Sequence, residues 1–247
     1  MTSSNWVPLG FQEDASAYQS GSQTARIWTE AWVRDWGFCP RCGAASLEPA
    51  RNNAQAKDFS CNVCSEGYEL KSSKSPFGKK IVNGAFESLN RRMESAENPS
   101  LLMMRYDQAT KEVRDLIGVP KQFFVPAIIE KRKPLSPTAR RAGWIGCNIL
   151  ISQVPNLGRV PIILDGKHQS KQSVVDNWNA TNFMRDKGLS SRSWLLAVLE
   201  CVDRLELDAF SLRDVYDFEA QLKTQFQTTT MFVQKFASKC KFYATAA

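Results

Sequence analysis

Four cysteines in the first third of the chain have the spacing of metal ligands. They form two pairs, each with two residues between its members, and residues 43–60 separate the pairs. The cysteines are Cys39, Cys42, Cys61 and Cys64. Two such knuckles bring four thiolates to one tetrahedral Zn²⁺. Because four thiolates leave no open coordination position, we expect this zinc to be structural; the alternative is a set of cysteines buried for packing.

A second group of residues beside the cysteines could hold a hard cation and cleave a phosphate ester. Glu69 and Lys71 are two residues apart, so on a strand both point to one face. If the zinc segment lies between two strands, Asp58 meets Glu69 across the sheet. The two carboxylates and the carbonyl oxygen of Leu70 would then ligate Mg²⁺, which can activate a water. Lys71 would position that water or stabilise the developing negative charge. The alternative is a surface Asp and an exposed Glu/Lys pair.

Residues and motifs that the sequence lacks argue against several classes of function. His168 is the only histidine, which disfavours histidine-based nucleases and Ser-His-Asp chemistry. The pattern GxxxxGK[ST] is absent, so we expect no nucleotide cofactor. The N-terminal residues do not resemble a signal peptide and no apolar run is long enough to span a bilayer, so we expect no membrane association. Cysteine pairs of metal-binding type then favour the reducing cytoplasm.

The charge distribution suggests an anionic partner. The chain has a formal net charge of +7. Residues 71–92 contain six Lys/Arg and one acid, and residues 130–171 contain eight Lys/Arg and two acids. Residues 194–222, in contrast, contain seven acids and two Lys/Arg. The basic stretches predict a phosphate-binding surface, with ordinary solvated faces as the alternative.

Alternating helix-like and strand-like segments predict an α/β (α+β) core. We expect helices over residues 22–36 and 84–96. Strands are expected within residues 58–71, 100–106, 122–129, 144–151 and 160–164.

A domain boundary is expected near Lys187 and Gly188, dividing the chain into domains 1–187 and 188–247. Residues 193–205 have the pattern of an amphipathic helix. Ser211 is a good N-cap for a second helix over residues 212–226. Two such helices begin many winged-helix domains, although two helices alone are also an ordinary motif.

The sequence resembles the family of Dam-replacing proteins and DpnI-type methyl-directed restriction endonucleases. The matching segments are SQTARIWTEAWV, FCPRCG, KDFSCNVCSEGYELKSSK, KPLSPTARRAGWIGCNI, SQVPNLGR and GLSSRSW, which are spread over most of residues 20–227. The resemblance implies a bacterial type II enzyme that cuts double-stranded DNA at GATC when the adenine is N6-methylated. It also implies a PD-(D/E)xK core with an inserted four-cysteine zinc ribbon, Mg²⁺ as the catalytic ion and a C-terminal winged helix. We expect a monomer.

The resemblance also implies roles for single residues. It places Asp58 and Glu69 as metal ligands, Lys71 as the catalytic lysine, the four cysteines on zinc, and Glu30 in a supporting role. Trp144 matches the tryptophan of the methyladenine-reading pocket, where an indole can pack on the methyl group; the alternative is a core tryptophan. Arg140 and Arg141 would fix the register through phosphate or guanine contacts.

The end of the chain departs from the family pattern. Residues 228–247 read TTTMFVQKFASKCKFYATAA and lack the expected basic recognition helix and wing. Codons can be chosen for this tail such that a different reading frame of the same DNA encodes NNHVRAKIRQQVQILRD. That peptide has the pattern of an amphipathic basic helix. We therefore hypothesise a frameshift and a truncated winged helix, which the codons of the gene can refute. The alternatives to an active nuclease are a methylated-DNA-binding protein that does not cleave and an enzyme disabled by this truncation.

Overall fold

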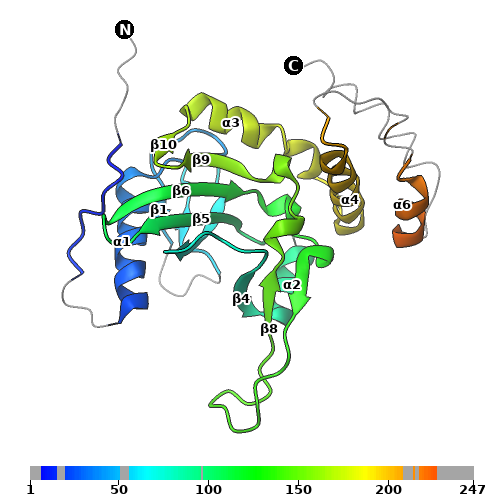
Figure 1. Cartoon of the computed structure of the whole chain (residues 1–247), viewed down its shortest axis with the longest axis horizontal. Coiled ribbons are helices and arrows are strands. Elements are labelled where there is room, and N and C mark those ends of the chain that lie inside the picture. The colour runs from blue at the N-terminus through cyan, green and yellow to red at the C-terminus, as the bar shows by residue number, and fades with distance from the viewer. Residues whose placement is uncertain are drawn as a thin grey trace.

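The chain folds as a mixed α/β protein with two sheets (Figure 1). This computed structural model describes residues 7–15, 20–50, 56–95, 97–207, 214 and 217–226. The α/β class predicted from the sequence is confirmed. Among the described residues, no helix combines the length and apolar character that a bilayer span requires.

The larger sheet has seven strands in the order β1-β2-β3-β5-β6-β9-β10. They are β1 (Glu48–Pro49), β2 (Phe59–Ser60), β3 (Gly67–Ser73), β5 (Ser100–Asp107), β6 (Glu112–Val119), β9 (Val160–Leu164) and β10 (Lys167–His168). Neighbouring strands are antiparallel except for β3 and β5, which are parallel. Since parallel strands need a crossover connection, the chain leaves this sheet after β3 and returns at β5.

The smaller sheet has three strands in the order β4-β8-β7. They are β4 (Ile81–Ala85), β7 (Ile129–Lys131) and β8 (Gly146–Ile149). Helix α2 (Phe86–Glu94) follows β4 directly and lies in the crossover between β3 and β5. The connection between β7 and β8 forms a long hairpin that projects from the body of the molecule, at the bottom of Figure 1.

Strand β5 divides the core into two clusters because its side chains alternate between the two faces of the sheet. Leu101 and Met103 join a cluster with the smaller sheet, α2 and the C-terminal helices. Leu102 and Met104 join a second cluster with α1 and the cysteine segment. In the parallel pairing Glu69 is opposite Leu101 and Lys71 opposite Met103. Both charged residues therefore lie on the face that is turned toward the smaller sheet.

Four further helices of the described part of the chain surround the sheets. They are α1 (Gly21–Trp36), which contacts β3, α3 (Lys171–Asn179), which contacts β9, α4 (Leu189–Leu205) and α6 (Glu219–Phe226). In Figure 1, α4 and α6 lie at the opposite end of the molecule from α1. Apolar side chains of α4 enter the first core cluster, so this helix shares a core with the sheets.

Comparison with the sequence predictions gives one clear error. The helix expected over residues 22–36 and the strands expected over 100–106 and 160–164 are confirmed. Residues 122–129 were expected to form a strand, which is wrong, because Lys121–Phe123 and Pro126–Ile128 are 3-10 turns. Their apolar character reflects burial in the core, and Pro126 lacks the N–H that a ladder needs. The β6, β4 and α3 segments were not anticipated.

The C-terminal predictions are tested only in part. The described end of the helix expected over residues 212–226 is helical, as α6. Residues 208–213 and 215–216, with the Ser211 cap, lie outside the described residues, as does the tail of residues 228–247. The frameshift hypothesis and the truncated winged helix therefore stay predictions.

Candidate active site and metal centre

The four predicted zinc ligands lie together in two knuckles of matching geometry. Their sulfur atoms all lie within 4.8 Å of one another. In each knuckle the residue after the second cysteine has a positive φ, +73° at Gly43 and 59° at Ser65. The backbone N–H of each of these residues also donates to the carbonyl of the first cysteine of its knuckle, at a distance of 2.8 Å. The left-handed turn explains why glycine suits position 43.

The donor set fits a closed zinc site. The Cys39–Cys64 and Cys42–Cys61 sulfur pairs are each 3.6 Å apart, close to the roughly 3.8 Å edge of a tetrahedron with Zn–S bonds of about 2.3 Å. Burial raises the pKa of the Cys39 thiol and also that of Tyr68, so the tyrosine stays protonated. Its hydroxyl lies 3.0 Å from the Cys39 sulfur, where it can donate to a thiolate.

The same segment brings the predicted catalytic carboxylates to adjacent strands. In the β2–β3 register Phe59 is opposite Tyr68, and Asp58 N–H donates to the Tyr68 carbonyl at 2.8 Å. Asp58 directly precedes β2 and lies beside β3. The Leu70 N–H donates to Asp58 Oδ2 at 2.8 Å, which fixes the carboxylate beside the Glu69–Leu70 peptide. The Asp58 carboxylate is therefore held next to the strand that carries Glu69, and both side chains are of the type that ligates a hard cation.

Lys71 completes this group. Its Nζ is 2.6 Å from Glu69 Oε1, and the two side chains are 27% and 16% exposed, so solvent and a ligand can reach both. Glu30 on α1 forms an ion pair with Arg26 at 2.6 Å. The Asp58 charge also raises the pKa of Arg26, after the larger effects of Glu30.

Two arginines that the sequence analysis did not single out lie near the same group. Cys147, fully buried on β8, has a pKa raised by burial and by the charge of Glu69, while Arg92, Lys71 and Arg132 lower it. The charges of Glu69, Lys71 and both arginines thus all act on this buried thiol. Arg92 is on α2 and Arg132 follows β7, so only the fold brings them together; their single signal in the sequence was membership of the two basic stretches.

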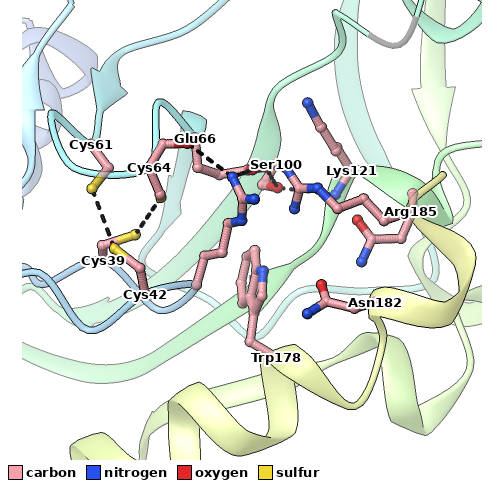
Figure 2. A network of polar contacts seen from close by, with 12 residues as sticks. Cys39, Cys42, Cys61, Cys64, Glu66, Ser100, Lys121, Trp178, Asn182 and Arg185 are labelled. Carbon is pink, nitrogen blue, oxygen red and sulfur yellow. Dashed lines mark hydrogen bonds and ion pairs between the residues drawn. The ribbon is translucent and has the colours of Figure 1, made fainter.

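A buried acid joins the zinc knuckles to the rest of the fold (Figure 2). The Glu66 side chain, directly before β3, is 0% exposed. Its Oε2 lies 2.7 Å from Arg185 Nη2 and 3.3 Å from Arg41 Nη1, and its Oε1 accepts from Ser100 Oγ at 2.7 Å. Arg41 lies between the two cysteines of the first knuckle and also donates to the Cys64 carbonyl. Glu66 therefore ties both knuckles to β5 and to the chain before α4.

The predicted methyl-reading residues lie elsewhere, on the hairpin between β7 and β8. Trp144 is half-buried, and Arg140 and Arg141 are exposed. The Arg141 guanidinium lies over the indole, with Cζ 4.7 Å from the ring centroid. Trp144 is thus not a fully buried core residue, and it lies on the hairpin shortly before β8 begins.

We expect each chain to bind one zinc ion, and we expect the substitution Cys42→Ser to abolish this binding. Cys42 is exposed, so its replacement removes a ligand with little loss of packing, and the free energy of unfolding should fall with the metal. Metal analysis of the purified proteins checks this, together with chemical denaturation. Cys147→Ser is the control and should keep its zinc. A Cys42→Ser protein with full zinc content would contradict the assignment.

Glu66→Gln should destabilise the fold by about 3 kcal/mol, because it leaves two arginines facing a neutral group in a largely buried site. Urea denaturation measures the change. The matched control is Glu112→Gln, which removes an exposed pair with Arg114 at 3.9 Å and should change stability by less than about 1 kcal/mol. Equal effects of the two substitutions would show that the Glu66 network does not hold the knuckles in place.

Comparison with known families assigns the chain. A model described as DpnI, the Dam-replacing family, matches residues 9–187, and a model described as DpnI_C, the Dam-replacing HTH domain, matches residues 190–240. The second match includes residues beyond those that the structure describes. The two matches together cover nearly all of the sequence, which implies a restriction nuclease that carries a DNA-binding HTH domain. The chain therefore belongs to the Dam-replacing family.

Proposed function

We propose that this protein is a type II restriction endonuclease that cuts both strands of GATC when the adenine is N6-methylated, by Mg²⁺-dependent phosphodiester hydrolysis. Residues 1–187 would form a PD-(D/E)xK catalytic domain with a zinc ribbon inserted, and residues 188–247 a DNA-binding domain of winged-helix type. The observation that supports the proposal is the hydrogen bond from Leu70 N–H to Asp58 Oδ2, which holds the Asp58 carboxylate beside the strand of the Glu69–Lys71 ion pair.

The residues of the site have separable tasks in this reaction. Asp58, Glu69 and the Leu70 carbonyl would ligate Mg²⁺, which when bound supplies a Lewis acid and lowers the pKa of a ligated water. Because Leu70 N–H occupies only Asp58 Oδ2, the other carboxylate oxygen remains for a cation. Among the described residues, the ion pair given for Lys71 is with Glu69. Its ammonium would position the attacking water or stabilise the negative charge that develops on the phosphate.

The hairpin between β7 and β8 provides a surface that suits DNA. Residues 131–146 contain five Lys/Arg and no acid. Backbone bonds across the hairpin hold its shape, from Arg132 N–H to the Gly146 carbonyl (3.0 Å) and from Leu135 N–H to the Trp144 carbonyl (2.9 Å). Arg140 and Arg141 would contact phosphate or guanine, and the Trp144 indole would pack on the adenine methyl group, a contact worth about 1 kcal/mol.

The direct test uses one plasmid prepared with and without adenine methylation at GATC, incubated with the protein and Mg²⁺. We expect cleavage of the methylated plasmid only. Cleavage of both preparations would keep the nuclease and refute methyl reading. If neither is cut, a gel shift on methylated DNA distinguishes a binding protein from an inactive one.

Asp58→Asn should reduce the cleavage rate by about a thousandfold or more, since metal catalysis supplies several kcal/mol. Asparagine keeps an acceptor for the Leu70 N–H, so the strand pairing should survive, and Asp58→Ala should be equally inactive. Binding to methylated DNA in a gel shift should remain. Asp186→Asn, at an exposed acid outside this group, is the control. Cleavage by Asp58→Asn at the wild-type rate would refute the active-site assignment.

Replacing Lys133 and Arg140 together with glutamine should weaken DNA binding and reduce the slope of log K against log [salt] by about two. Both side chains are exposed on the hairpin. The loss should be equal for methylated and unmethylated duplexes, because phosphate contacts carry no sequence information. Fluorescence anisotropy over a salt series measures the slope, with Lys187→Gln as control. An unchanged slope would place the DNA away from this hairpin.

A further inference from the structure

Gly146, at the start of β8, is a glycine that the backbone does not require. Among the described residues, the glycines with positive φ are Gly43, Gly143 and Gly166. Gly146 is not one of them, so an alanine could adopt its backbone conformation. The residue is also buried and paired in a strand, where glycine is normally unfavourable. A reason for glycine at this position must therefore lie in the space around it.

That space is occupied by Trp144. A Cβ at position 146 would lie 2.8 Å from both Cη2 and Cζ3 of the indole, and 3.6 Å from Cδ of Arg132. Contacts of 2.8 Å between carbon atoms are well inside the optimal separation of roughly 3.5–4.0 Å, so one of the two groups has to move. The outer ring of Trp144 thus lies directly against the backbone of β8.

The surroundings of Trp144 leave the ring as the part that yields. The backbone N–H of Trp144 donates to the Arg141 carbonyl at 3.0 Å, and the Trp144 carbonyl accepts from the Leu135 N–H at 2.9 Å. The backbone of Trp144 is therefore fixed. The Arg141 guanidinium lies over the ring at 4.7 Å. Position 146 is fixed in turn by pairing with Ala85 of β4 and by the Arg132 N–H. An alanine at 146 therefore shifts the indole and not the strands.

We propose that Gly146 is a positioning residue for methyl recognition: the absent side chain lets the Trp144 ring lie against β8, in the place from which it contacts the adenine methyl group. The inference rests on the proposed function and deepens it. Attraction between apolar atoms falls steeply when a gap of even 0.5–1 Å opens, roughly by a quarter to a half. A displaced indole therefore loses the methyl contact while the catalytic residues of β3 stay in place.

The experiment compares the rates of cleavage of methylated and unmethylated GATC duplexes by Gly146→Ala, with Gly84→Ala as a matched control. Gly84 lies on the neighbouring strand β4, and a Cβ there meets no atom within 4 Å. Gly146→Ala should lower the methylated-to-unmethylated rate ratio by up to about fivefold, the limit at which the whole methyl contact is lost. Gly84→Ala should leave the ratio unchanged.

A second background separates positioning from general damage. Phenylalanine lacks the outer ring of tryptophan, so in Trp144→Phe an alanine at 146 has room. We expect Gly146→Ala to change both rates by less than about twofold in that background. If Gly146→Ala does not fold, folding of the double variant supports the steric explanation, and failure of both overturns it. Equal losses on both duplexes in both backgrounds would likewise overturn the inference.

Failure of the proposed function is visible separately. It would appear in the wild-type protein itself, as equal cleavage of the two duplexes or none, before any variant is compared. A wild-type preference that Gly146→Ala leaves intact would instead overturn the role of Gly146 alone.

Discussion

The pairing of β2 with β3 across the second cysteine knuckle is the constraint on which the rest of the structure depends. Asp58 and Glu69 lie at the open end of this hairpin, and the cysteines Cys61 and Cys64 lie at its turn. The same strand carries Tyr68, whose carbonyl accepts from Asp58 and whose hydroxyl meets the Cys39 sulfur. The contacts that bring the cysteines together and those that hold Asp58 beside β3 therefore belong to the same hairpin. A two-residue strand such as β2 has too few ladder bonds to fix that register alone.

Two acids on one segment show how burial assigns different tasks to the same side chain. Glu66 is fully buried, paired with two arginines and hydrogen-bonded by a serine, so moving it would leave uncompensated buried charge. Glu69 is partly exposed and paired with one lysine. The buried acid therefore holds the fold, whereas the proposed function has the partly exposed acid exchange its partner for a cation.

Local patterns were sufficient for some of these features and not for others. Cysteine spacing predicted the metal cluster, and the two-residue spacing of Glu69 and Lys71 predicted a shared face, because both depend on neighbours in the chain. Helix α1 was predicted from helical periodicity, and strand β5 from an apolar run of strand length. Residues 122–129 were misassigned, since a buried irregular segment is as apolar as a strand. Glu66 had no local signal, because its role depends on Arg185 and Ser100, which are far away in the sequence, and Arg92 and Arg132 had only their place in the basic stretches. The approach of Asp58 to β3 was conditional on a zinc turn that the sequence alone could only suggest.

In the proposed function, cutting belongs to β3 of the larger sheet and reading to the hairpin between β7 and β8. A methyl contact worth about 1 kcal/mol loses roughly a quarter to a half of its attraction when a gap of 0.5–1 Å opens, so the reading side chain would have to be placed more tightly than an exposed loop normally allows. The projecting hairpin meets this demand with backbone bonds at Leu135 and Arg132, a guanidinium over the indole, and a strand against the outer ring. Only the last of these needs a residue without a side chain, which is why the position after Ile145 is the sensitive one.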